Sequence, residues 1–133
     1  MFSLTKRQKK GIKELAEKYG LNFLTLFGSQ AEKKTHKKSD VDLAYSAKNE
    51  LDYKKEYELL CELQGILRTK TRIDLVDTKN APPLLLNRIA FKGQLLAEVT
   101  PRSFTYFQMY AFKLFVEAKQ LFNIRDQYIL KNL

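Results

Sequence analysis

The chain has 133 residues, and 44% of them are hydrophobic. This size is typical of one domain with its own core, so we predict a single domain over residues 1–133, with a core over residues 1–99 and a C-terminal helical segment over residues 100–133. Lys and Arg outnumber Asp and Glu by 24 to 15, which gives a net charge of +9. Such a charge is typical of proteins that bind nucleotides, nucleic acid or an acidic protein.

The single cysteine, Cys61, excludes an internal disulfide and favours a reducing compartment. No apolar run approaches the about 20 residues of a membrane span, and the N-terminal residues lack the apolar segment of a signal peptide. We therefore expect a cytoplasmic protein that makes no contact with a membrane.

The first third of the chain is predicted to form one helix and two strands. Apolar residues recur at helical spacing over residues 3–19. Residues 21–27 are almost all apolar, which is typical of a strand buried on both faces. A polar segment over 30–39 follows, and then a second strand over 40–45 and a turn at 46–49.

The middle of the chain alternates helices and strands. We predict a helix over residues 50–70, a strand over 72–77, a short helix that begins at Pro82 and Pro83, and a short strand over 94–99. In the first helix, Cys61 is expected to be a small packed side chain rather than a nucleophile. The residues expected on the buried faces of the two helices are Tyr53, Tyr57, Leu59, Leu60, Leu63, Ile66 and Leu67, and then Leu84, Leu85, Leu86, Ile89 and Ala90.

A last long helix is predicted from Pro101 to about Leu130. Its apolar stripe has two interpretations, which can both hold: it covers the sheet as core, or part of it is a surface for a partner. The stripe consists of Phe104, Phe107, Ala111, Leu114, Phe115, Ala118, Leu121 and Phe122.

Small and acidic residues mark the junctions of the first two strands. Gly28 and Ser29 follow the first strand, and Asp40 and Asp42 begin the second. Residues two apart on a strand point to the same face, so the two carboxylates can together hold Mg²⁺. Gly28 lets backbone approach a phosphate, and Ser29 adds a hydroxyl. For these groups to converge, the two strands must be antiparallel neighbours. The pattern predicts a site for Mg²⁺ and a nucleotide.

A third carboxylate is expected from the third strand, where Asp74 and Asp77 are candidates. They are three residues apart, so they face opposite sides of the strand and only one can join the cluster. Asp74 lies between two apolar residues within the strand, whereas Asp77 opens a segment with ordinary turn chemistry. We therefore select Asp74 as the third catalytic and metal-binding acid.

The Gly28-Ser29 pair, ten residues and then Asp40-Val41-Asp42 resemble the signature of the polymerase-β-type nucleotidyltransferases. The small size and element order are similar to those of the minimal nucleotidyltransferase (MNT) antitoxins, which act with HEPN-domain ribonuclease toxins. The resemblance implies an α/β (α+β) fold, with a small mixed sheet flanked by helices. It also implies Mg²⁺-dependent transfer of AMP from ATP to a tyrosine of a HEPN toxin, which silences the toxin. On that pattern Asp40, Asp42 and Asp74 hold metal, and Gly28 and Ser29 bind the nucleotide.

One departure from the family pattern leaves alternatives open. The family often continues Gly-Ser-x-Ala-Arg-Gly, but Glu32 and Lys33 stand here in place of the arginine and the second glycine. A binding-only antitoxin that blocks its toxin by contact is one alternative. A small-molecule nucleotidyltransferase is another, although the chain is short for it. A nucleic-acid-binding module is suggested only by the charge, because no recognised motif for RNA or DNA is present.

Overall fold

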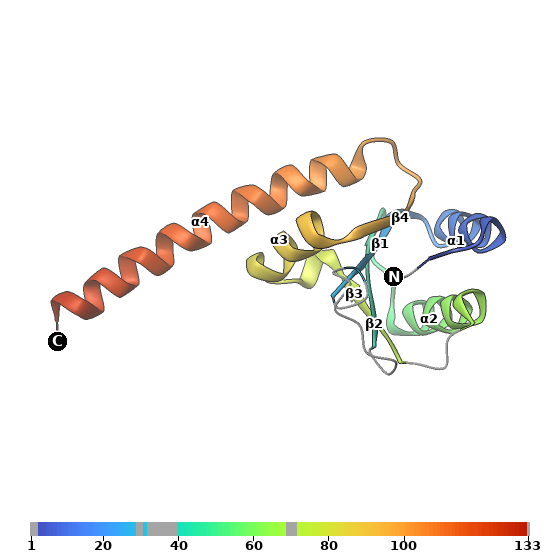
Figure 1. The fold of residues 1–133 in the computed structure, drawn as a ribbon, viewed down its shortest axis with the longest axis horizontal. Coiled ribbons are helices and arrows are strands. Elements are labelled where there is room, and N and C mark those ends of the chain that lie inside the picture. Colours follow the sequence, from blue (N-terminus) through green and yellow to red (C-terminus); the bar gives the residue numbers. More distant parts are fainter. Residues whose placement is uncertain (1–2, 29–30, 32–39, 69–71, 133) are drawn as a thin grey trace.

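The computed structural model places a four-stranded sheet between helices that cover both of its faces (Figure 1). The structure describes residues 3–28, 31, 40–68 and 72–132. In chain order the elements are α1 (Lys6–Lys18), β1 (Leu21–Phe27), β2 (Val41–Ala47), α2 (Tyr53–Leu67), β3 (Ile73–Asp77), the short 3-10 helix η1 (Thr78–Asn80), α3 (Pro83–Lys92), β4 (Gln94–Glu98) and α4 (Ser103–Lys131). Helices α1 and α2 lie on one side of the sheet, and α3 and α4 on the other (Figure 1). In the described part of the chain, no helix is long and apolar enough to cross a membrane.

The strands lie in the order β3-β2-β1-β4. Strand β1 pairs antiparallel with β2 and with β4, and β2 pairs parallel with β3. Helix α2 is therefore the crossover that a parallel pair requires. The mixed sheet, its antiparallel β1–β2 pair and its short fourth strand are confirmed.

Local sequence signals account for the ends of the first two helices. Thr5 caps α1 by a capping box, in which its hydroxyl accepts from the Gln8 amide and the Gln8 side chain accepts from the Thr5 amide. Gly20 follows α1 with φ of +66°, a left-handed conformation that favours glycine. Asp52 caps α2 by accepting from the Lys55 amide. Both helices therefore begin three residues later than predicted, α1 at Lys6 and α2 at Tyr53.

The larger core lies between the sheet and the helices α1 and α2. Alternate residues of β2, Val41, Leu43 and Tyr45, point into it and are at most 2% exposed. Tyr45 is fully buried, and its hydroxyl donates to Glu56 Oε2 of α2 at 2.7 Å. Burial and that hydrogen bond raise the pKa of Tyr45 far above its usual range, so this tyrosine is a structural group that stays protonated.

The opposite sheet face packs against α3 and α4. Ile89 of α3 contacts Phe27 and Ala44 of the sheet. The first turns of α4 are held by Phe23 of β1, whose ring centroid lies 5.2 Å from that of Phe104 and 5.1 Å from that of Phe107. Strand residues of β2 thus alternate between two cores, and the even-numbered ones face α3.

The buried face of α2 is rotated from the predicted one. Leu59, Leu63 and Leu67 form it, and the predicted Tyr53 and Tyr57 are 94% and 67% exposed. The prediction followed the aromatic residues at helical spacing, but in the structure the neighbouring Glu56, not a tyrosine ring, contacts Tyr45 of the sheet.

Smaller expectations also differ from the structure. Cys61 is exposed on α2 rather than packed, and Leu84 is exposed at the start of α3. Strand β2 continues to Ala47, into the predicted turn, where the Asn22 amide donates to Ser46 Oγ at 3.0 Å.

Helix α4 packs on the body only through its N-terminal half. Ala111 is its one buried residue among those described, and Phe107 and Leu114 pack beside it against α3. From Lys119 onward every described residue of α4 is exposed, including Leu121 and Phe122. The first part of the predicted apolar stripe, to Leu114, therefore packs as core, whereas Leu121 and Phe122 at its end do not.

Candidate functional site

Two of the predicted carboxylates lie side by side on neighbouring strands. Asp42 is the second residue of β2, and the parallel register places it opposite Asp74 of β3. Asp40 directly precedes β2 and is exposed. On the other side of Asp42, the antiparallel register places Phe27, the last residue of β1. The C-terminal end of β1 and the N-terminal ends of β2 and β3 thus meet at one end of the sheet, which is the edge referred to below.

The three acids lie close enough for their negative charges to change the pKa of Asp42. Partial burial raises the pKa of the Asp42 carboxyl, and the negative charges of Asp74 and Asp40 raise it further. A hydrogen bond with the Asp74 carboxyl adds to the effect by favouring the protonated form. Arg88 acts in the opposite direction and lowers the pKa. The site therefore concentrates negative charge that a cation would relieve.

The choice of Asp74 over Asp77 has a geometric basis. Asp74 lies opposite Asp42, and Arg72 Nε holds one of its carboxylate oxygens at 3.0 Å. Asp77 lies at the far end of β3, opposite Tyr45, where it caps η1 by accepting from the Lys79 amide at 3.0 Å. Asp77 therefore has the turn role that the sequence predicts for it.

Gly28 is required by its position beside Asp42. Its φ is +76°, and a Cβ built on it would collide with the Asp42 carboxylate. The backbone can pass this close to the acids only because residue 28 has no side chain. The predicted Ser29 lies outside the described residues, as do Glu32 and Lys33 of the altered loop.

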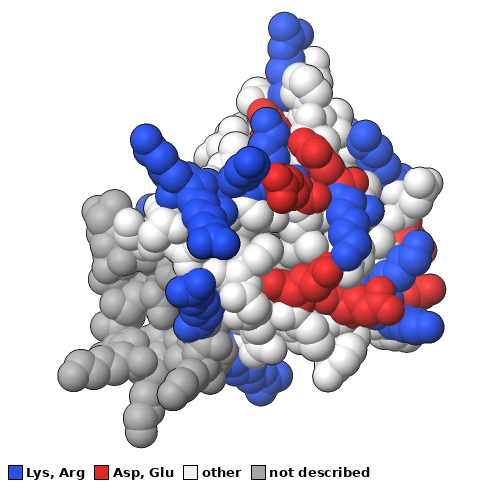
Figure 2. Space-filling model, turned by 90° about the vertical axis from the view of Figure 1, so that its right-hand side faces the viewer, with Lys and Arg blue, Asp and Glu red and all other residues white. Residues whose placement is uncertain are grey.

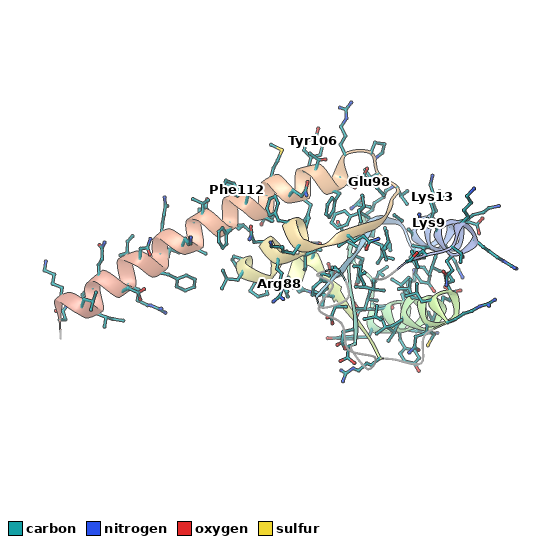
Figure 3. The ribbon with its side chains drawn as sticks, viewed as in Figure 1. Lys9, Lys13, Arg88, Glu98, Tyr106 and Phe112 are labelled. Atoms are coloured by element: carbon teal, nitrogen blue, oxygen red, sulfur yellow. The ribbon has the colours of Figure 1, made fainter. Side chains whose placement is uncertain are left out.

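Sequence reasoning missed Arg88, which α3 brings to this edge. Arg88 is exposed, and it precedes Ile89, whose contacts with Phe27 and Ala44 seat α3 on the sheet. Figure 3 labels Arg88 on the side of α3 away from α4. The signal in the sequence was one arginine inside an apolar helix, and only the fold shows that this helix brings the arginine close enough to act on Asp42.

The donor set of the site suits a hard divalent cation, although the three acids do not lie close enough together to bind one ion jointly. Within the described residues, no three Asp, Glu, His or Cys side chains lie close enough together to bind one metal ion. The Asp74 carboxylate is engaged by Arg72. Carboxylate oxygens from Asp40, Asp42 and Asp74 are the ligands that Mg²⁺ prefers, and the mutual repulsion at Asp42 is what such an ion would neutralise.

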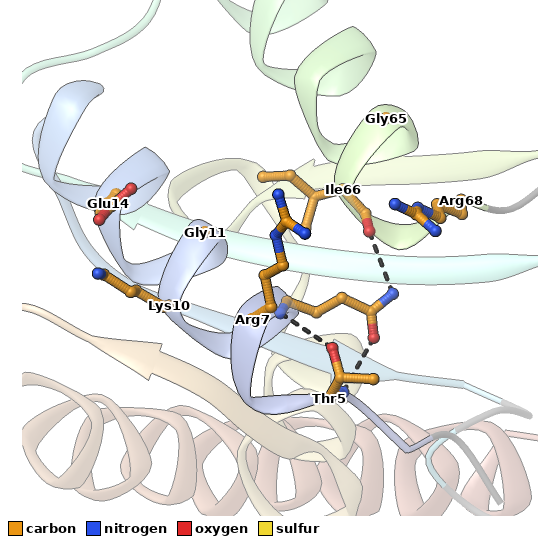
Figure 4. Close-up of a pocket in the computed structure, with 9 residues that line it drawn as sticks. Thr5, Arg7, Lys10, Gly11, Glu14, Gly65, Ile66 and Arg68 are labelled. Carbon is orange, nitrogen blue, oxygen red and sulfur yellow. Dashed lines mark hydrogen bonds between the residues drawn. The ribbon is translucent and has the colours of Figure 1, made fainter.

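A larger pocket lies on the other side of the molecule, between α1 and the end of α2 (Figure 4). It is open, has a volume of about 590 Å³, and carries Arg7, Lys10 and Arg68 with Glu14 among its lining residues. Its Gln8 side chain already joins the two helices by donating to the Ile66 carbonyl at 3.1 Å. Figure 2 shows this side of the molecule, where basic side chains gather on the left of the view and alternate with acidic ones on the right. We interpret the pocket as a helix junction rather than a reaction site.

A second pocket, of about 510 Å³, lies at the opposite end of the sheet from the acids and beneath the start of α4. Its central polar residue is Asn22, which accepts from Thr100 Oγ1 at 2.8 Å and donates to Ser46 Oγ. The polar groups of this pocket therefore form hydrogen bonds that hold the start of α4 against the strands. The edge with Asp42 and Asp74 remains the candidate active site.

Comparisons with known proteins place these residues in a wider context. A family model described as "Polymerase beta, Nucleotidyltransferase" matches residues 10–101, which include Gly28, Asp40, Asp42 and Asp74. The chain is 33% identical over 76 residues to the protein adenylyltransferase MntA of Shewanella oneidensis. That match covers 57% of this chain and 53% of MntA, so the chain spans about half the length of this curated relative.

Solved structures share the whole architecture. A chain in a crystal structure of a toxin–antitoxin with AMP-PNP is similar with a TM-score of 0.68 and 25% identity, over 93% of this chain and 96% of that chain. A structure of a tri-AMPylated Shewanella oneidensis HEPN toxin in complex with its MNT antitoxin gives a TM-score of 0.63 at 23% identity, over 94% of each chain. The predicted fold, with its long C-terminal helix, is confirmed.

Proposed function

Because this chain belongs to the polymerase beta nucleotidyltransferase family, we propose that it is a Mg²⁺-dependent adenylyltransferase and an antitoxin. It transfers AMP from ATP to a tyrosine hydroxyl of a HEPN-domain ribonuclease toxin in the cytoplasm, and the modified toxin is inactive. The observation that carries this proposal is the pairing of Asp42 with Asp74 beside Gly28 at one sheet edge. The relative named a protein adenylyltransferase and the similar structure with AMP-PNP support AMP as the transferred group.

Each residue of the site has a role that its position supports. Asp40 and Asp42 would hold Mg²⁺, which when bound would supply positive charge against the triphosphate and the leaving group. Gly28 lets the backbone lie directly against the Asp42 carboxylate, and a residue without a Cβ there would also let a phosphate approach the backbone, to which Ser29 would add a hydroxyl. Arg88 adds positive charge next to the acids.

In the transfer, the tyrosine oxygen forms a bond to the α-phosphorus of ATP. The bond from that phosphorus to the bridging oxygen breaks, and pyrophosphate leaves with the electron pair. Asp74, which lies opposite Asp42 in the sheet, would accept the proton of the tyrosine hydroxyl. The site therefore supplies charge neutralisation, an approach path for phosphate and a proton acceptor.

A binding-only antitoxin is the second candidate. The exposed apolar half of α4 favours it, because such a surface suits stable contact whether or not AMP is transferred. The two candidates share a partner and differ in whether Asp42 is needed.

The deciding experiment incubates the purified chain with labelled ATP, Mg²⁺ and the product of the adjacent gene, which we expect to be a HEPN-domain toxin. We expect label on a tyrosine of the partner, and none after Asp42→Ala or when EDTA removes the metal. Glu17→Gln is the matched control, because it removes an exposed acid on α1, and it should leave transfer unchanged.

Two results would count against an enzyme. Undiminished labelling by Asp42→Ala would show that the carboxylate cluster is not the site. A tight complex without any label from the wild-type protein would establish the binding-only antitoxin instead.

A further inference from the structure

Positive charge is concentrated at the start of α1 and the end of α2, on the side of the molecule that Figure 2 shows. Six exposed basic residues lie there, and we call them the basic surface: Lys6, Arg7, Lys9, Lys10, Lys13 and Arg68. The acids of α1, Glu14 and Glu17, leave a net charge of 6 − 2 = +4 in this region, out of +9 for the chain. No residue of the candidate active site belongs to the basic surface, so its charge needs a separate explanation.

The lysines of α1 occupy positions that do not favour a helix. All four fall within an arc of about 100° on the helix, opposite the buried Leu15. Lys6 with Lys10, and Lys9 with Lys13, are like-charge pairs four residues apart, which destabilise a helix. The first turn also carries no acid, although the N-terminal end of a helix favours negative charge. A bound polyanion would relieve both effects.

A groove borders the basic surface. It is the pocket of about 590 Å³ between α1 and the end of α2, and Arg7, Lys10 and Arg68 line it (Figure 4). Within the described residues, none of these three side chains forms an ion pair. A Cβ built on Gly65, another lining residue, would meet no atom within 4 Å, so the groove is open at that point. Its size and charge suit an anionic ligand.

Arg68 is held in a conformation that costs free energy. It ends α2 with φ of 50° and ψ of 36°, in the left-handed region that favours glycine. A glycine would end the helix at a lower cost but would carry no charge. An arginine in such a position is expected where its charge is used.

The lining residues favour phosphate, rather than a base, as the group that is bound. Among the described residues that line the groove, none is aromatic, whereas proteins usually hold the bases of a single strand by stacking on aromatic rings. Arginine and lysine bind the phosphates of nucleic acid without preference for sequence. A single extended strand can enter the groove, whereas a duplex is too wide for it.

The basic surface and the acids lie on different sides of the sheet. Ala44 contacts Ile89 of α3 and lies two residues after Asp42, so the Asp42 side chain is directed to the side of α3 and α4. Helices α1 and α2 cover the other side (Figure 1). A ligand on the basic surface therefore leaves the approach to Asp42 open, and both sites can be occupied at once.

We propose that the basic surface binds the phosphate backbone of single-stranded nucleic acid, with contacts from Arg7 and Lys10 of α1 and from Arg68 at the end of α2. This inference goes beyond the proposed function, because it adds a ligand and a site that AMP transfer does not use. The binding tolerates any sequence and weakens as the salt concentration rises.

The test measures binding of the full chain to a fluorescent single-stranded RNA of mixed sequence by anisotropy. Arg7→Gln with Lys10→Gln removes two charges of the groove. The matched control, Lys54→Gln with Lys131→Gln, removes two exposed charges elsewhere. We expect at least about a tenfold loss of affinity for the first pair and less than about twofold for the second. The slope of log affinity against log salt should flatten by about 1.4 for the first pair, at about 0.7 for each lost phosphate contact.

Arg68→Gly separates binding from folding. Glycine suits the left-handed conformation, so the Tm should stay the same or rise, while the affinity for the RNA should fall at least about threefold. A single-stranded DNA of the same sequence should bind the wild type within about threefold of the RNA, because phosphate is common to both.

Several results would overturn the inference. Equal losses from the two double variants would show that overall charge, and not the groove, holds the strand. Displacement of the RNA by Mg²⁺ and ATP would place it at the acids instead. Equally tight binding of polyglutamate would assign the surface to an acidic protein segment. None of these measurements uses AMP transfer, so the inference can fail while the proposed function holds, and the reverse.

Discussion

Replacing Asp42 by Asn should make the protein more stable at pH 7 while abolishing its activity. The carboxylate lies opposite Asp74, and neighbouring strands are about 4.8 Å apart. Two unit charges at that distance repel by about 0.9 kcal/mol in water and about 3.5 kcal/mol at an effective dielectric constant of 20. The Asp74 side chain is 38% exposed, so screening puts the gain near 1 kcal/mol. For a chain of this size that corresponds to a rise in Tm of about 4 °C.

The stability gain of Asp42→Asn should depend on pH, because the pKa of Asp42 is raised in the folded protein. The folded-state pKa of Asp42 is raised, so the folded protein carries an unfavourable charge at every pH above that pKa. The penalty disappears as the pH falls toward the ordinary aspartate value of about 3.9. The stability advantage of Asp42→Asn should therefore be present at pH 7 and vanish near pH 4.

Differential scanning calorimetry without divalent cations measures the effect, with Glu17→Gln as the control for loss of one negative charge. Adding Mg²⁺ and ATP should then raise the Tm of the wild type more than that of Asp42→Asn, because the variant lacks one ligand. A lower Tm for Asp42→Asn at pH 7, or an advantage that persists unchanged at pH 4, would refute the account of repelling carboxylates.

Three further variants test other parts of the structure. Gly28→Ala places a Cβ against the Asp42 carboxylate at a φ of +76°, and we expect a loss of about 1–3 kcal/mol in denaturant unfolding together with lost ATP binding. Arg88→Ala should raise the KM for ATP more than it lowers kcat in steady-state assays, and Arg88→Lys should recover part of the loss; equal effects on both constants would remove Arg88 from nucleotide binding. Tyr45→Phe deletes the hydroxyl that donates to Glu56, so it should lower stability by about 1–2 kcal/mol without changing activity.

The elements that the sequence predicts well are those whose own residues determine them. The apolar run over 21–27 forms β1 with those bounds, and alternation in β2 buries Val41 and Leu43 and turns Asp42 the other way. Strand parity shows from the sequence that only one of Asp74 and Asp77 can join Asp42, whereas the parallel register that places Asp74 opposite Asp42 comes from the fold.

The features that the sequence leaves open depend on contacts between distant segments. The orientation of α2 buries Leu59, Leu63 and Leu67 and brings Glu56 to the Tyr45 hydroxyl, and a helical stripe that contains Tyr53 gives no sign of it. Arg88 approaches the acids only because Ile89 seats α3 on β1 and β2. The sequence predicts the length of α4 closely, but not where α3 stops covering it.

The separation of the two sheet faces has a consequence for how this protein can diverge. Nearly all of the large core, from Ile12 to Ile73, lies on the side of α1 and α2. Substitutions in the outer half of α4 therefore leave that core intact, and natural variation there can re-target recognition without loss of foldability. We expect chimaeras that exchange this half-helix between relatives to fold normally and to inherit the binding preference of the donor.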